Sequence, residues 1–196
     1  MTRALRPLVA VTLLALLAVP VASSGRAQQP ATVSPNAQAA LVLRVLGYDR
    51  GLRSRATSGT VNVLTLFKPG DSTSETACQG LARAINQFSS RVTVGGMRTR
   101  ATAVGFTSAD ALAEAAQNAQ AVYVCPGLEA SIGAISSTAR RRSLLSITAR
   151  EADVRAGLSV AIVPGAQLRL VVNVTAASAE GARLDAALLR IATVVR

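Results

Sequence analysis

Short runs of β-branched and aliphatic residues alternate with helix-like segments along this chain, and this alternation constrains the fold most strongly. The three clearest apolar runs occupy residues 61–67, 121–125 and 144–148. Segments with apolar residues at helical spacing lie at residues 75–88, 109–117 and 128–142. Strand–helix–strand units of this length predict right-handed crossovers and a largely parallel sheet.

The remaining segments complete a predicted α/β three-layer sandwich with flanking helices. We expect a helix at residues 37–46, a strand at 91–95, a short edge element at 101–106, an antiparallel hairpin of 158–163 with 167–174, and a final helix at 179–195. That last helix would place Leu184, Leu188 and Ile191 on one face, packed on the sheet. The hairpin would form an antiparallel edge of the mostly parallel central sheet.

The N-terminus has the pattern of a secretory signal peptide. Arg3 and Arg6 precede an apolar stretch at residues 8–21, and Ala27 ends a small-residue cleavage motif. The apolar stretch is shorter than the roughly 20 residues of a spanning helix, so cleavage is favoured over a retained anchor. We therefore expect a signal peptide at residues 1–27, a flexible leader at 28–38, a domain at 39–196, and a periplasmic protein without a later membrane span.

Composition excludes several functional classes. The 196 residues include no His, which removes Ser-His-Asp and Cys-His catalytic sets and the commonest metal ligand. The formal charge is +11, but only 3% of residues are aromatic, and basic charge without aromatic residues is a weak signal of nucleic-acid binding. We expect no enzyme activity, no cofactor, no metal and no nucleic-acid partner.

The chain has two cysteines, Cys78 and Cys125. An even number in an oxidising compartment suggests one disulfide. Cys78 falls early in the helix after the strand at 61–67, and Cys125 ends another strand, so both would lie near the same face of the sheet. Two buried, unpaired thiols remain the alternative.

Loops at the carboxyl ends of parallel strands usually form the binding crevice. The candidate ligand or partner residues in these loops are Lys68, Gly70, Ser72, Thr73 and Gly127. The loop at 68–74 precedes a helix that Thr73 or Ser74 could cap, which suits anion binding at a helix N-terminus. It lacks the Walker A pattern, and an ordinary polar loop is the alternative.

Two further charged clusters have simple structural explanations. Arg140, Arg141 and Arg142 end a predicted helix, where basic residues complement the helix dipole and are expected to be solvated. Contact with anionic lipid or an acidic partner is the alternative for this cluster. Glu151 and Asp153 are neighbours in sequence and are expected to cap or solvate a loop. We therefore expect neither cluster to be catalytic.

Several segments together resemble the YfiR/HmsC-like family of bacterial periplasmic proteins. The similar segments are 144–148 (LLSIT), 157–163 (GLSVAIV), 168–173 (LRLVVN), 176–177, 184–192 (LDAALLRIA), 39–50 and 61–67. Three features depart from the family pattern. Leu170 replaces an aromatic residue, and Asp185 and Ala186 replace a serine pair. The cysteine that often starts the third strand in the family is absent there, and Cys125 lies at the end of that strand instead. The family's disulfide pairing is therefore not transferred to this chain.

The resemblance implies a non-enzymatic regulator. Such a protein would repress a membrane-bound diguanylate cyclase by binding its periplasmic domain, and redox or envelope stress would relieve the repression and raise cyclic-di-GMP and biofilm formation. A homodimer is a further expectation. The rival interpretation is a periplasmic small-ligand or anion-binding domain that uses the strand-end loops; an exported enzyme is disfavoured.

Overall fold

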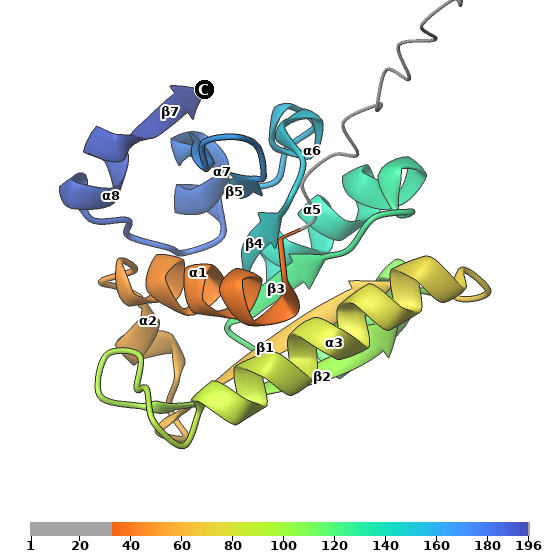
Figure 1. Ribbon diagram of the computed structural model, residues 1–196, viewed down its shortest axis with the longest axis horizontal. Helices are drawn as coiled ribbons and strands as arrows, with labels where there is room; N and C mark the ends of the chain where they lie inside the picture. The colour runs from red at the N-terminus through yellow and green to blue at the C-terminus, as the bar shows by residue number, and fades with distance from the viewer. Residues whose placement is uncertain (1–32, 196) are drawn as a thin grey trace, which may run out of the picture.

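A computed structural model describes residues 33–195 of the chain (Figure 1). The predicted signal peptide at residues 1–27 lies outside the described residues. The strands are β1 (Thr60–Phe67), β2 (Arg98–Gly105), β3 (Ala121–Val124), β4 (Leu145–Thr148), β5 (Val160–Val163), β6 (Arg169–Asn173) and β7 (Ala192–Val195). They form one sheet in the order β2-β1-β3-β4-β5-β6-β7, parallel except for the antiparallel pair β5–β6. The predicted α/β class and the antiparallel hairpin are confirmed.

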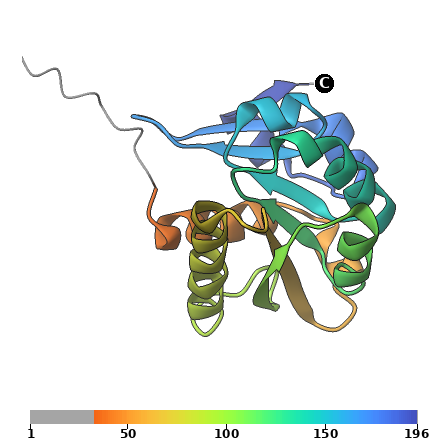
Figure 2. The same cartoon turned by 90° about the vertical axis from the view of Figure 1, so that its right-hand side faces the viewer.

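Helices cover both faces of the sheet. They are α1 (Pro35–Gly47), α2 (Leu52–Arg55), α3 (Ser72–Phe88), α4 (Ala109–Ala115), α5 (Ile132–Arg142) after a 3-10 turn at Glu129–Ser131, α6 (Glu151–Arg155), α7 (Val174–Ala179) and α8 (Ala186–Ile191). Figure 2 shows α1 and α3 on one side of the sheet and α5 on the other. The side chains of β1 alternate accordingly: Val61 and Val63 pack with α1 and α3, whereas Leu64 and Leu66 pack with α4 and α5.

The predicted strand at residues 91–95 is wrong. Within it, only Val94 pairs, through an isolated bridge to Met97 that encloses a tight turn. Gly95 and Gly96 have positive φ angles of 59° and 81°, which break strand geometry. The second strand is instead β2, which absorbs the predicted edge element at 101–106 and forms one edge of the sheet.

The predicted helix at residues 179–195 is also wrong. The chain forms α7, turns at Gly181 with φ of 74°, forms the short α8, and ends in β7 parallel to β6. The β-branched residues Thr193 and Val194 favour the strand over a continued helix. As a result, β7 rather than the hairpin forms this edge, and Leu188 is buried while Ile191 is 65% exposed.

A buried ion pair ties the N-terminal helices to the C-terminal part at the amino ends of the strands. The Asp49 carboxylate forms an ion pair with the Arg55 guanidinium and accepts hydrogen bonds from the backbone N–H groups of Gly51 (2.8 Å) and Arg183 (2.9 Å). Arg55 also donates to the carbonyl oxygen of Ser143 at 2.6 Å. This network joins three parts of the chain that are far apart in sequence.

A second buried carboxyl group lies at the same end of the sheet. Glu180, fully buried just after α7, accepts from the backbone N–H (2.8 Å) and hydroxyl (2.6 Å) of Ser146 and from the hydroxyl of Ser159. Burial raises the pKa of Glu180 to about 7, and the serine donors and Arg140 oppose this rise. The carboxyl group therefore links β4, β5 and α7.

Among residues 33–195, no helix is long and apolar enough to cross a membrane.

Candidate functional site

The loops that follow β1 and β3 meet at the carboxyl ends of the strands. The backbone N–H of Lys68 donates to the Ser74 hydroxyl at 3.0 Å, which closes the loop after β1. A Cβ atom built at Gly127 would lie 3.0 Å from Asp71 Oδ2 and 3.5 Å from the Lys68 side chain. With its φ of 94°, Gly127 therefore permits the close approach of the two loops.

The start of α3 differs from the sequence expectation. Asp71, and neither Thr73 nor Ser74, is the N-cap: its Oδ1 accepts from the backbone N–H groups of Thr73 (3.1 Å) and Ser74 (3.0 Å). The other candidate residues of this loop, Lys68, Gly70 and Ser72, are exposed to solvent, as is Thr73. Because a carboxylate already occupies the amide donors at the helix N-terminus, this position is poorly suited to a bound anion.

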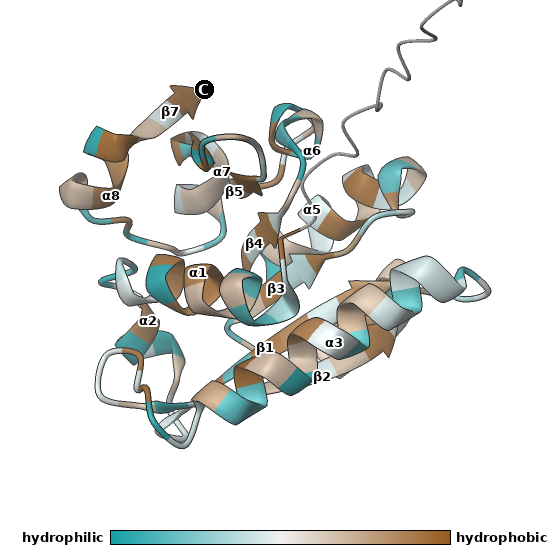
Figure 3. Cartoon of the chain, viewed as in Figure 1, coloured by the Kyte–Doolittle hydropathy of each residue, from teal (hydrophilic) through white to brown (hydrophobic). Residues whose placement is uncertain are grey.

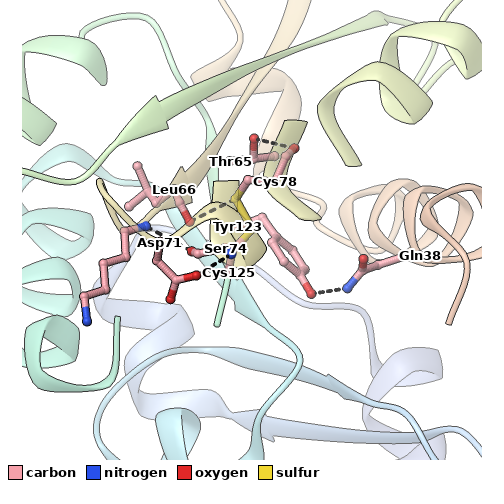
Figure 4. The surroundings of a disulfide bond; sticks show 9 residues. Gln38, Thr65, Leu66, Asp71, Ser74, Cys78, Tyr123 and Cys125 are labelled. Atoms are coloured by element: carbon pink, nitrogen blue, oxygen red, sulfur yellow. Dashed lines mark hydrogen bonds between the residues drawn. A yellow bond between two sulfur atoms is a disulfide. The ribbon is translucent and has the colours of Figure 1, made fainter. Parts of the chain in front are cut away.

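Cys78 of α3 and Cys125 at the end of β3 form a disulfide with a Cα–Cα distance of 6.0 Å (Figure 4). Both residues are buried. The Thr65 hydroxyl donates to the carbonyl oxygen of Cys78 at 3.2 Å, and the Cys78 sulfur lies 3.0 Å from the carbonyl oxygen of Leu66. The disulfide therefore fixes the first turns of α3 against β1 and β3.

A hollow of about 200 Å³ opens beside this disulfide. Its lining comes from α1, α3 and the carboxyl ends of β3, β4 and β5, and consists of Val33, Gln38, Leu41, Ala77, Tyr123, Cys125, Pro126, Ala149, Ile162 and Pro164. Gln38 Nε2 donates to the Tyr123 hydroxyl, as Figure 4 shows. The hollow is thus mainly apolar with one polar pair, which is the usual chemistry of a small-ligand pocket.

The hollow lacks the chemistry of a general base. Burial raises the pKa of Tyr123, which keeps its hydroxyl neutral. Within residues 33–195, no group of three or more His, Cys, Asp or Glu side chains could hold a metal ion.

The acidic pair after β4 has a structural role. Glu151 and Asp153 lie in the short helix α6, where a loop was expected. Glu151 pairs with Arg155 (2.7 Å) and with Arg169 of β6 (3.3 Å), and these arginines lower its pKa. Asp153 accepts from the Thr148 hydroxyl at 2.7 Å. Both carboxylates thus brace the ends of β4 and β6.

An apolar groove between α1, β6 and α8 was missed by sequence reasoning. It has a volume of about 160 Å³ and is lined by Leu41, Arg44, Val45, Tyr48, Leu168, Leu170, Leu188 and Ile191. Leu168 and Ile191 at its rim, and Val194 of the neighbouring β7, are exposed. Figure 3 shows β7 in hydrophobic colours at this edge of the molecule. We call the eight lining residues the C-terminal groove. The sequence did not reveal this groove, because the predicted long helix placed Ile191 against the sheet.

Comparison with solved structures shows the fold. The chain is similar to a conserved domain protein from Vibrio cholerae O1 biovar El Tor (14% identity, TM-score 0.57, 83% of this chain and 60% of that one). It is also similar to an ABC domain in complex with L-Trp from Streptococcus pneumoniae (13%, 0.50, 77% and 62%). A third is the ligand-free, open form of CD0873, a substrate-binding protein with adhesive properties from Clostridium difficile (12%, 0.53, 69% and 54%). The chain therefore spans between 54% and 62% of these structures.

Sequence comparison identifies the family. No curated protein matches the chain. The family model described as YfiR/HmsC-like matches residues 36–193, which includes every strand of the sheet except the last two residues of β7. This protein belongs to the YfiR/HmsC-like family of periplasmic regulatory proteins.

Proposed function

We propose that this protein represses a membrane-bound diguanylate cyclase by binding its periplasmic domain, thereby lowering cyclic-di-GMP and biofilm formation. The observation that carries the proposal is the family match over residues 36–193. Such an inhibitor would shift the cyclase between two states by binding one of them more tightly.

The C-terminal groove is the surface we propose for the cyclase. Contiguous exposed apolar side chains on a soluble domain are typical of protein–protein contacts. Leu168 and Ile191 present such a surface, and Arg44 at the rim supplies a charge that could fix the partner's orientation. The strand-end loops with Lys68 and Gly127 are the second contact surface that we propose.

The disulfide would make this binding redox-dependent. It connects α3 to β3, and α3 packs on α1, which forms one wall of the C-terminal groove. Reduction would loosen α3 and, through α1, the groove. Repression would then weaken without any change in the residues that contact the cyclase.

The test is cyclic-di-GMP in cells that lack the gene and are complemented with exported copies. We expect deletion to raise cyclic-di-GMP and the wild-type copy to reverse the rise. Ile191→Asp should fail to reverse it, whereas Thr175→Asp, at an exposed position of α7 outside the groove, should act like wild type. Unchanged cyclic-di-GMP on deletion would refute the proposal, and full activity of Ile191→Asp would refute the groove as the contact.

A ligand-binding role is the second candidate, and the hollow beside the disulfide favours it. One similar structure is described as a substrate-binding protein and another as a complex with L-Trp, which supports the same alternative. Thermal-shift measurements with phosphate, amino acids and peptidoglycan fragments would test it. A stabilisation that disappears in Gln38→Ala would place the ligand in the hollow. A homodimer stays a proposal, which sedimentation of the purified protein would test.

A further inference from the structure

Basic residues concentrate at the β2 edge of the sheet. Residues 76–109 contain four arginines and not one Asp or Glu. Arg98 and Arg100 belong to β2, where exposed and buried residues alternate, so both side chains lie on the same face. Their register partners on β1 are Thr60 and Asn62. This row is exposed at the edge of the sheet face that α4 and α5 cover elsewhere.

Arg91, one of these four arginines, and Arg53 of α2 lie at the adjacent end of the sheet. Arg53 of α2 donates to the carbonyl oxygen of Gly95 at 2.8 Å, which places it against the loop between α3 and β2. Figure 1 shows this loop next to α2. Arg91 lies in the same loop and is followed by Val92, an apolar side chain that is 41% exposed. We call Arg53, Arg91, Arg98 and Arg100 the basic edge.

The basic edge has no acidic counterpart within residues 33–195. The ion pairs described there use other arginines: Arg50, Arg55, Arg150, Arg155 and Arg169. Asp110 and Glu114 of the neighbouring α4 form no ion pair with Arg98 or Arg100. The positive charge of this edge is therefore directed to solvent and attracts anionic partners.

The edge is poorly suited to a protein that adds a strand to the sheet. Asn86 of α3 covers the outer side of β2: its Nδ2 donates to the carbonyl oxygen of Ala101 at 2.9 Å, and its Oδ1 accepts from the Ala101 N–H at 2.8 Å. Both backbone groups that an added strand would use at Ala101 are thus occupied.

We infer that the basic edge docks on a membrane surface that contains anionic phospholipid. Arg98 and Arg100 lie on one face of the sheet at this edge, and Arg91 and the exposed apolar Val92 lie on the other face, beside α1 and the end of α3. Arginines on both faces of an edge match a surface of many phosphate groups better than a single anion. Docking of this kind would hold the protein at the membrane with α2 and β2 towards the lipid. This inference does not depend on the cyclase proposal, because any membrane-proximal periplasmic protein could use it.

The test is co-sedimentation of the protein, purified from the periplasm, with lipid vesicles. The vesicles contain either phosphatidylcholine alone or phosphatidylcholine and phosphatidylglycerol in equal parts. We expect binding to the second only, weakened by added salt. Arg98→Gln with Arg100→Gln should reduce the affinity roughly fivefold per arginine, about 25-fold for the pair. The matched control is Arg141→Gln with Arg142→Gln, which removes the same charge at the exposed end of α5.

Three results would overturn the inference: no binding to phosphatidylglycerol vesicles, wild-type affinity of the β2 variant, or an equal loss in the α5 variant. The last would mean that net charge alone governs binding. If the β2 variant lost cyclic-di-GMP repression while wild type bound no vesicles, an acidic protein surface would replace lipid as the partner. Since Arg98, Arg100, Arg141 and Arg142 are all exposed, both variants should keep the wild-type circular dichroism spectrum and melting temperature, which is checked first.

Discussion

The two ends of the parallel strands are held together by different chemistry. At the carboxyl ends, the Cys78–Cys125 disulfide joins α3 to β3 beside an apolar hollow. At the amino ends, the buried carboxyl groups of Asp49 and Glu180 bind backbone N–H groups, serines and one arginine. The first connection responds to thiol reductants, whereas the second responds to pH and to loss of a charged partner. In a regulator built this way, reduction of the disulfide can loosen the carboxyl ends of the strands, beside the hollow, while the amino ends stay folded.

We expect the largest loss of unfolding free energy from Asp49→Ala, at the amino ends of the strands. The substitution leaves the mostly buried Arg55 guanidinium without its carboxylate and removes the acceptor of two backbone N–H groups. Breaking a buried ion pair from one side costs roughly 3–5 kcal/mol of unfolding free energy. Urea unfolding followed by circular dichroism measures this loss. Glu114→Ala, at an exposed carboxylate without an ion pair, should change stability by about 0.5 kcal/mol or less.

We expect the next largest loss of unfolding free energy from removing the disulfide at the carboxyl ends of the strands. Cys78→Ser combined with Cys125→Ser opens a loop with a sequence separation of 47 residues and should lower the unfolding free energy by roughly 2–4 kcal/mol. Reductant should destabilise the wild type by a similar amount and leave the double variant unchanged. Reductant should also leave the cost of Asp49→Ala unchanged, because the two sites share no residue. Identical wild-type unfolding curves with and without reductant would contradict a stabilising disulfide.

The pH dependence of the unfolding free energy further distinguishes the amino ends of the strands, where Glu180 lies, from the carboxyl ends. The pKa of Glu180 rises in the folded state from 4.5 to about 7, so the folded protein keeps the proton more tightly than the unfolded chain. The associated stability is fully present below about pH 4.5 and is lost as the pH rises to about 7. The loss should reach about 3 kcal/mol.

Glu180→Gln is the control for this effect, because an amide keeps one acceptor oxygen and does not titrate. The difference in unfolding free energy between wild type and Glu180→Gln should change across pH 4.5–7 in favour of the variant. The pKa values of Glu151 and Asp185 are lowered by hydrogen bonds and by nearby arginines. Their contribution to the unfolding free energy is lost at lower pH in both proteins, so it cancels in the difference. A difference that stays constant over this range would show that Glu180 does not change its charge there.

Sequence reasoning succeeded where the signal was local. The β-branched run of β1 and the helices α3, α4 and α5 were predicted to within a few residues, because propensity and apolar spacing act over one turn or one strand. β7 was missed because its four residues follow directly after α8, with no turn signal between them. In the segment predicted as a strand at 91–95, Val92 and Val94 alternate with polar residues, but Gly95 and Gly96 have positive φ angles that turn the chain.

The candidate site depends on pairs that are distant in sequence, which carry no local signal. Gln38 and Tyr123 of the hollow are 85 positions apart, and at the opposite end of the sheet Ser146 and Glu180 are likewise 34 positions apart. Only the parallel order of the strands brings such residues together. The cysteine pair was within reach of sequence reasoning because both residues fall at the ends of predicted strands or the starts of predicted helices, and the topology then places them at one face.

The smallest effect concerns the polar pair of the hollow. Tyr123→Phe removes the hydroxyl that accepts a hydrogen bond from Gln38 and keeps the ring in the core. Gln38 is half-buried and can bind water instead, so the loss should be about 1 kcal/mol. The control is Tyr48→Phe, at a half-buried tyrosine whose hydroxyl forms no hydrogen bond within residues 33–195; its effect should be about 0.5 kcal/mol or less. If Tyr123→Phe lowered the unfolding free energy as much as opening the disulfide does, the Gln38–Tyr123 hydrogen bond would contribute as much as the covalent bond to holding the carboxyl ends of the strands together.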